Sequence, residues 1–182
     1  MGGLLSVDLS EYQGILNTIG GAEKQINTAS RRSVSKVVDF AATHIGRGIA
    51  AEEQVPVSTL RKGGSARRGQ RIFKSKPRRD KTSGSVWVGY NPIRAAYLGA
   101  LTQQKAGAKS GKHFFDRSFV ATMPSGHRSV FIRRGKTSLP IREQSHPITS
   151  AQRVVDSVQD RTTQRLIDIF QHELSYEVSR GA

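Results

Sequence analysis

The side chains of this sequence that could perform acid–base chemistry or bind a metal are its histidines and two close pairs of carboxylates. No two histidines have the i,i+4 spacing of a helical metal site, and no H-E-x-x-H motif occurs. The pairs Glu52–Glu53 and Asp156/Asp160 have no nucleophile or further ligand beside them, so both are interpreted as solvated helix faces. Cysteine is absent, which excludes thiolate chemistry. The scattered histidines are His44, His113, His127, His146 and His172. We therefore predict no enzymatic activity, no metal and no cofactor.

The strongest chemical signal is a basic segment, residues 61–81, which holds ten lysines and arginines and one acid, Asp80. The whole chain carries a formal net charge of +15, so much of its positive charge lies in this one segment. Arginine favours bidentate contact with phosphate or carboxylate, and Phe73 alone is too little for base stacking. We predict contact with DNA or an acidic protein surface, the alternative being a solvated loop without a partner. The predicted contact residues are Arg61, Lys62, Arg67, Arg68, Arg71, Lys74, Lys76, Arg78, Arg79 and Lys81.

Two long helices are predicted from apolar residues at helical spacing, one over residues 22–53 and one beyond Pro147. A short helix is predicted before Gly20-Gly21, where Ser10 and Gln13 have capping-box spacing. The stripe of the first long helix is mostly Ala and Val and is longer than one small domain needs. We therefore predict that it packs against other subunits through Val34, Val37, Val38, Ile45 and Ile49.

The middle of the chain is predicted to be β-structure, because SVWVGY, SFVATM, SVFIRR and LPI (85–90, 118–123, 129–134 and 139–141) are rich in β-branched or aromatic residues. Residues 71–74 form a further candidate strand. Residues 124–128 predict a hairpin turn with Gly126 at a positive φ, and residues 91–113 predict a loop that includes one helical turn. A second basic patch frames the hairpin: Arg128, Arg133, Arg134 and Lys136.

The order of helices, short strands and helix predicts an α+β fold, with a small antiparallel sheet flanked by a long N-terminal and a long C-terminal helix and an extended basic loop. We expect one domain over residues 1–182. Its parts are a helical N-terminal part (1–55), a basic loop (56–84), short strands with a hairpin (85–146) and a C-terminal helix (147–182). No stretch has the pattern of a signal peptide, and no apolar run approaches the ~18 residues of a membrane span, so we expect no membrane contact.

The segment SFVATMPSGHRSVFIRRGKTSLPIREQSHPI, followed by a long helix, resembles the minor tail protein Z family of tailed phages. The matching pieces are a strand ending F-V-A-x-M (Phe119–Met123), a glycine turn at Gly126, a V-F-x-R strand (Val130–Arg133) and L-P-I (Leu139–Ile141). The front of the chain also matches in kind, with a short helix, a break, a long helix and then a very basic region. The resemblance therefore covers nearly the whole chain.

This resemblance implies a structural virion protein that completes the head-proximal end of the tail and contributes to the head–tail junction. It also implies a homo-oligomeric ring, six-fold as tail tubes of this kind are. The implied partners are the tail tube, a tail terminator or neck protein, and the genomic DNA in the channel. Assembly in the host cytoplasm is expected. The alternatives are a free basic nucleic-acid-binding protein, associated with ribosomes or packaging, and a nuclease, for which the sequence shows no carboxylate or histidine cluster.

Overall fold

A computed structural model of the chain describes residues 2–7, 23–61, 71–78, 82–133, 135 and 137–181. It divides into two compact units. The first, which we call the helix–sheet unit, takes its described residues from Met1–Gly48, Ile72–Gly89 and Ala151–Ala182. The second, the strand-rich unit, takes them from Ile49–Arg71 and Tyr90–Ser150. The two units do not test whether residues 1–182 form one domain, so that statement stays a prediction.

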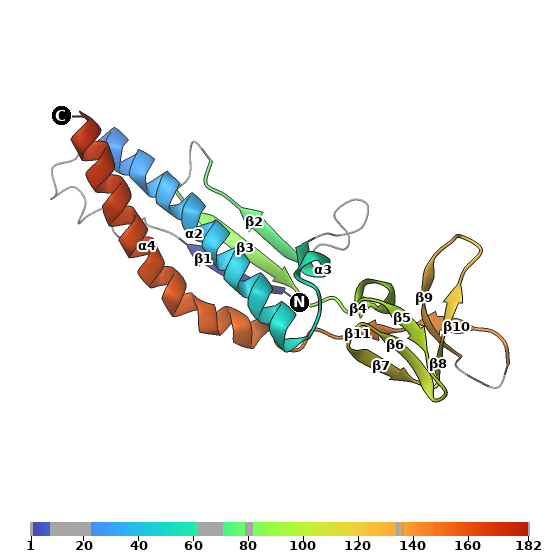
Figure 1. Cartoon of the computed structure of the whole chain (residues 1–182). Helices are drawn as coiled ribbons and strands as arrows, with labels where there is room; N and C mark the ends of the chain where they lie inside the picture. Colours follow the sequence, from blue (N-terminus) through green and yellow to red (C-terminus); the bar gives the residue numbers. More distant parts are fainter. Residues whose placement is uncertain are drawn as a thin grey trace. The chain divides into compact units, whose positions relative to one another are not determined.

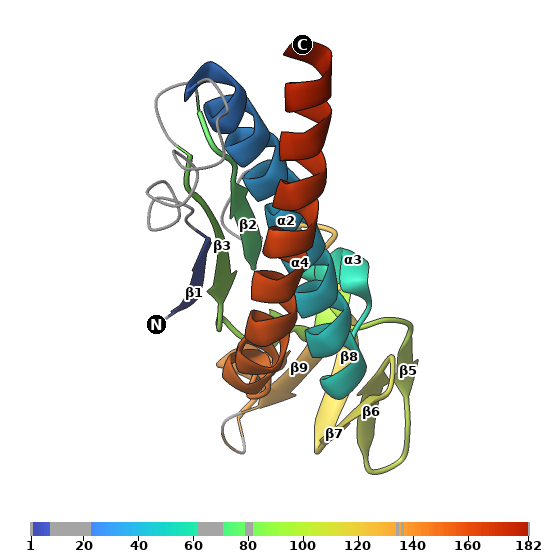
Figure 2. The ribbon, with the colours of Figure 1, turned by 90° about the vertical axis from the view of Figure 1, so that its left-hand side faces the viewer.

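The helix–sheet unit pairs two long helices with a three-stranded antiparallel sheet of order β1-β3-β2. The strands are β1 (Gly2–Val7), β2 (Ile72–Ser75) and β3 (Gly84–Gly89), and the helices are α2 (Glu23–Glu52) and α4 (Ala151–Gly181). Figures 1 and 2 show α2 and α4 side by side along the same face of the sheet. The predicted α+β class with a long helix near each end is confirmed.

The core of this unit follows from two patterns of apolar residues, the helical stripe of α2 and the alternation of residues along the strands. Alternate strand residues face the helices, and Leu5, Ile72, Val86 and Val88 are buried accordingly. The opposite residues of the register, Leu4, Phe73 and Trp87, lie in one row across the three strands on the other face. Leu4 is 64% exposed and Trp87 is 37% exposed, so this outer row keeps apolar surface accessible.

The apolar stripe of α2 is buried within the chain itself. Val34, Val37, Val38, Ile45 and Ile49 are all fully buried within the single chain. Gly84 of β3 lets the sheet come close, since a Cβ there would lie 2.7 Å from Val38 Cγ2 and 2.9 Å from Val34 Cγ1. The five side chains therefore have no surface to offer a second subunit, which corrects the prediction that they pack between subunits.

The strand-rich unit contains short elements and three small antiparallel sheets, of orders β5-β6-β7, β10-β9-β8 and β11-β4. Its core includes Ala95, Ala108 and Val130, against which Leu101, Phe115 and Val120 pack. The elements are α3 (Val57–Arg61), β4 (Ile93–Arg94), η3 (Ala95–Tyr97), β5 (Leu101–Gln103), β6 (Gly107–Ser110), β7 (His113–Asp116), β8 (Ser118–Thr122), β9 (Arg128–Arg133), β10 (Ile141–Glu143) and β11 (Ser145–His146).

The predicted hairpin is confirmed: β8 pairs with β9 in register from Ser118↔Ile132 to Thr122↔Arg128, and Gly126 has φ +79°. The third strand, predicted at residues 139–141, begins at Ile141 and continues to Glu143. The helical turn predicted within residues 91–113 is found as η3, but the prediction that the rest of this stretch is a loop is wrong, because it forms β4, β5 and β6. The short helix predicted before Gly20 lies outside the described residues. Within the described stretches, no helix is both long and apolar enough to cross a membrane.

Gly84→Ala is expected to lower the free energy of unfolding by about 1–3 kcal/mol, because the added methyl overlaps Val34 and Val38 and lies 3.1 Å from the carbonyl oxygen of Ser75. Urea denaturation followed by circular dichroism measures the change. Gly135→Ala is the matched control, since a Cβ at Gly135 meets nothing within 4 Å. Equal stability of the two variants would contradict the close packing of α2 on β3.

Candidate functional site

The described basic residues between 61 and 81 are divided between the two units. Arg61 and Arg71 belong to the strand-rich unit, whereas Lys74, Lys76 and Arg78 belong to the helix–sheet unit. Arg61 is exposed at the end of α3. Five predicted contact residues lie outside the described residues: Lys62, Arg67, Arg68, Arg79 and Lys81.

Arg71 is part of the fold and not of the surface, which corrects its prediction as a contact residue. The residue is only 8% exposed, and its guanidinium donates from Nε to the carbonyl oxygen of Asn91 at 2.9 Å and from Nη2 to that of Pro92 at 2.7 Å. Burial lowers the pKa of Arg71. A guanidinium held in this way joins the segment before β2 to the turn before β4.

Lys74 and Lys76 share one carboxylate partner. Their Nζ atoms lie 2.6 Å from Oδ1 and Oδ2 of Asp39 on α2. Hydrogen bonds from Lys74 and Lys76 hold the pKa of Asp39 below its usual value. The three side chains are about half exposed, so these pairs stabilise the fold weakly, but they reduce the net charge that the two lysines present.

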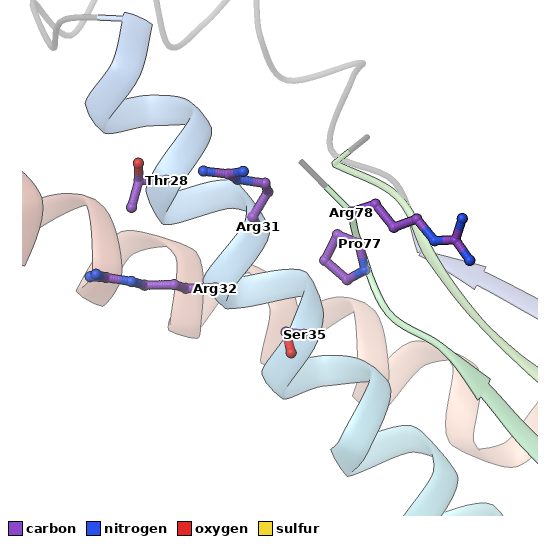
Figure 3. Close-up of a pocket in the computed structure, with 6 residues that line it drawn as sticks. All are labelled: Thr28, Arg31, Arg32, Ser35, Pro77 and Arg78. Carbon is purple, nitrogen blue, oxygen red and sulfur yellow. The ribbon is translucent and has the colours of Figure 1, made fainter. Parts of the chain in front are cut away.

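Arg78 is exposed and helps to line an open groove beside α2 (Figure 3). The groove has a volume of about 680 Å³. Its lining comes from α2 and from the residues that follow β2: Thr28, Arg31, Arg32, Ser35, Pro77 and Arg78. The sequence assigned no contact to Arg31 and Arg32, because only the strand pairing of β2 shows that Arg78 lies near them.

The hairpin patch is only partly described, and its described members do not share a face. Arg128 and Arg133 are five residues apart in β9, so their side chains point to opposite sides of the sheet. Arg133 places its guanidinium carbon 5.2 Å from the ring centroid of Phe119, a cation–π contact. Arg134 and Lys136 lie outside the described residues.

A buried carboxylate and its hydrogen-bond partners form a cluster in the strand-rich unit that was not predicted. Glu53, interpreted from sequence as a solvated residue, is only 6% exposed and follows the last residue of α2. Its Oε1 accepts from the backbone N–H groups of Thr149 and Ser150, both at 2.7 Å, and its Oε2 lies 2.8 Å from Nε2 of His146. The carboxylate therefore fixes the chain immediately before α4. By contrast, Asp156 and Asp160 are exposed on α4, as predicted.

The electrostatics of Glu53 favour its charged form. Burial alone raises the pKa of Glu53, but the hydrogen bonds from Ser150, His146 and Thr149 outweigh burial and lower it to about 2. The ring of His146 also contacts the ring of His113, with centroids 4.1 Å apart and the ring planes tilted by 40°. Burial, together with the nearby His146, lowers the pKa of His113.

The hydrogen bonds of Glu53 give this cluster a structural role. The hydroxyl of Thr149 already lies 3.3 Å from Glu53, and Glu53 is committed to two backbone N–H groups. Among the residues that the structure describes, no three His, Asp or Glu side chains are placed to hold a metal ion. The described geometry thus contains a fold-supporting carboxylate and an arginine-lined groove, and the second is the candidate contact site.

The family comparison agrees with the resemblance of the sequence motifs. A family model described as prophage minor tail protein Z matches residues 15–181 of the 182-residue chain. No curated protein and no solved structure was found to match it.

Arg71→Met is expected to lower the free energy of unfolding by about 2 kcal/mol, because it leaves the carbonyl oxygens of Asn91 and Pro92 without their charged donor. Arg61→Met removes the same charge from an exposed site and is expected to change stability by less than about 0.5 kcal/mol. Thermal and urea unfolding of both variants measure the difference. If Arg61→Met proves as costly as Arg71→Met, the structural role given to the buried guanidinium is wrong.

Acid is expected to destabilise the protein through Glu53. The folded-state pKa lies below the usual value of 4.5, so the carboxylate stabilises the fold above pH 4.5, and this contribution is lost as the pH falls toward about 2. The shift corresponds to about 3 kcal/mol. Urea unfolding between pH 7 and pH 2 should show a steep loss in the wild type and a flatter profile in Glu53→Gln.

Asp160→Asn removes an exposed carboxylate and serves as the control, with an acid profile like that of the wild type. An acid profile of Glu53→Gln that is as steep as the wild-type profile would show that other carboxylates cause the loss of stability.

Proposed function

Because the chain belongs to the prophage minor tail protein Z family, we propose that it completes the head-proximal end of a phage tail and contributes to the head–tail junction. Membership makes it a structural phage tail protein and a component of the virion. The observation that carries the proposal is the extent of the match, which covers residues 15–181 and so includes all of the strand-rich unit and all elements of the helix–sheet unit except β1. Assembly takes place in the host cytoplasm, before the particle is released.

The folded part of the chain contacts neighbouring tail proteins in this proposal, as one subunit of a ring with six-fold symmetry. The tail tube, a tail terminator or a neck protein is the neighbour. The apolar row formed by Leu4, Trp87 and Phe73 supports such a contact, because Leu4 and Trp87 remain exposed on the sheet face turned away from the core. Aromatic side chains are enriched at the centres of protein interfaces.

The basic residues face DNA in the channel or an acidic surface of the adjacent ring. Two of the predicted contact residues in the basic segment, Arg61 and Arg78, are exposed. Among the described residues, neither of them forms an ion pair. The proposal also includes Lys62, Arg67, Arg68, Arg79 and Lys81. The groove beside α2 adds Arg31 and Arg32 to it.

A free nucleic-acid-binding protein is the second candidate, and the net charge of +15 favours it. Gel filtration after nuclease treatment separates the two candidates. A ring-forming tail protein elutes as an oligomer, whereas a free binder elutes as a monomer that has lost its nucleic acid.

Stopping the reading frame early is expected to leave tails of normal length that fail to join heads, or joined particles that have lost their DNA. The reason is that a protein at the upper end of the tail acts after the tube has reached its length. Negative-stain electron microscopy of the lysate measures both defects, and the intact gene supplied in trans is the control. Fully infectious particles made without the protein would exclude the proposed function.

A further inference from the structure

We propose that two free copies of this chain pack face to face through the outer face of the β1-β3-β2 sheet, the face turned away from α2 and α4. The partner at this face is therefore a second copy of the same chain. This pairing goes beyond the proposed function, because it concerns the protein before it enters a tail. In the proposed function, the same face meets a neighbouring tail protein in the finished particle.

The register of the three strands arranges the outer side chains in two parallel rows. The apolar row consists of Leu4, Trp87 and Phe73, which lie opposite one another on the three strands. Two residues along each strand, on the same face, the register forms a row of three serines: Ser6, Ser85 and Ser75. A row of large side chains therefore lies directly beside a row of small ones.

The apolar row is accessible, and its aromatic side chains are held by contacts within the sheet. Leu4 is 64% exposed and Trp87 is 37% exposed in the single chain. The rings of Phe73 and Trp87 pack together, with centroids 5.2 Å apart. The indole of Trp87 also lies over Gly89, because a Cβ at Gly89 would be 2.5 Å from its Cη2 atom. Side chains that are already fixed lose little conformational entropy when a partner covers them.

The outer face is uncharged at every outward position of its strands. The two rows and the paired glycines Gly2 and Gly89 account for all of these positions. The chain as a whole carries a net charge of +15, so two copies repel each other wherever their basic residues approach. A neutral face is where contact between copies adds least to this repulsion, whereas an acidic partner would be recognised by the basic residues. The charge distribution therefore favours a second copy at this face.

The two rows also make the face complementary to itself. A two-fold axis that lies between two facing sheets, parallel to the rows and midway between them, places the apolar row of each copy over the serine row of the other. Trp87 then faces Ser85 of the second copy. Sheets that pack face to face lie about 10 Å apart, and large side chains opposite small ones fill the space between them.

The size of the face predicts a weak pair. The strands β1 and β3 have six residues each and β2 has four, so at about 3.4 Å per residue and about 4.8 Å per strand the face covers at most about 300 Å². Stable complexes bury about 800 Å² on each partner. We expect a dissociation constant of about 10 µM or higher, so that a tail protein with a larger contact surface displaces the second copy.

The test is self-association of the purified, nuclease-treated full-length protein, measured by sedimentation equilibrium at about 0.1 M and about 1 M salt. The dimer is expected to strengthen with salt, because screening weakens the repulsion between the copies. Trp87→Ser is expected to weaken association by about tenfold or more. Tyr176→Ser is the matched control, since it removes an exposed aromatic side chain from α4 and should leave association unchanged. Circular dichroism checks that both variants fold.

Chemical cross-linking tests the two-fold geometry independently of these variants. The chain has no cysteine, so Ser85→Cys introduces a single thiol at the centre of the face. In the proposed pair, the two thiols lie within about 10 Å of each other, so a short bis-maleimide should join them into a covalent dimer. Ser175→Cys places a thiol at an exposed position of α4 and is expected to give no covalent dimer.

Four results would overturn the pairing. These are a protein that stays monomeric at about 100 µM, well above the expected dissociation constant, association that weakens with salt, association that a folded Trp87→Ser variant retains in full, and an oligomer that forms without the Ser85→Cys cross-link. The last result would indicate a head-to-tail contact at this face. The proposed function is tested separately by particles made without the protein, so the pairing can fail while that function stands.

Discussion

The apolar stripe of α2 has to be covered, and the chain covers it with strands from distant parts of the sequence. Residues 2–7, 72–75 and 84–89 form the sheet, and Gly84 allows the closest approach to Val34 and Val38. The basic segment cannot be a free loop throughout, because Ile72 must enter the core as part of β2. This one requirement places Lys74 and Lys76 beside Asp39 and Arg78 beside Arg31. The positions of the described candidate contact residues in this unit are therefore a consequence of hydrophobic packing.

The charged residues of the basic segment consequently have different roles in the structure. The guanidinium of Arg71 donates hydrogen bonds to two backbone carbonyl groups, and Lys74 and Lys76 share a single carboxylate. Composition counts all of them equally, although only an exposed and uncompensated charge attracts a polyanion over a distance. A local excess of positive charge in the sequence thus overstates the surface that is available for contact.

The sequence predicted the features that depend on local pattern. The long helices were expected over residues 22–53 and 147–182 and are found at Glu23–Glu52 and Ala151–Gly181, because a repeated helical stripe is hard to mistake. The turn at Gly126 was predicted from its type and position. Strands β5 and β6 were missed because the buried positions of β6, Gly107, Ala108 and Ser110, are small or polar and carry no β-propensity signal. Glu53, Arg71 and the groove were misjudged or missed because partners far away in sequence decide whether a charge is buried.

The chain passes between its two units four times, at residues 48–49, 71–72, 89–90 and 150–151. The helix–sheet unit therefore takes its members from three stretches of the sequence, residues 1–48, 72–89 and 151–182. Any recombination crossover inside the coding sequence would join part of this unit from one parent to the remainder from another. The close contacts of Gly84 with Val34 and Val38, and of Gly48 with Val154, would then combine surfaces that had not evolved together. Genetic exchange among phages that carry such a gene is expected to transfer it whole, with viable crossovers falling in the flanking DNA.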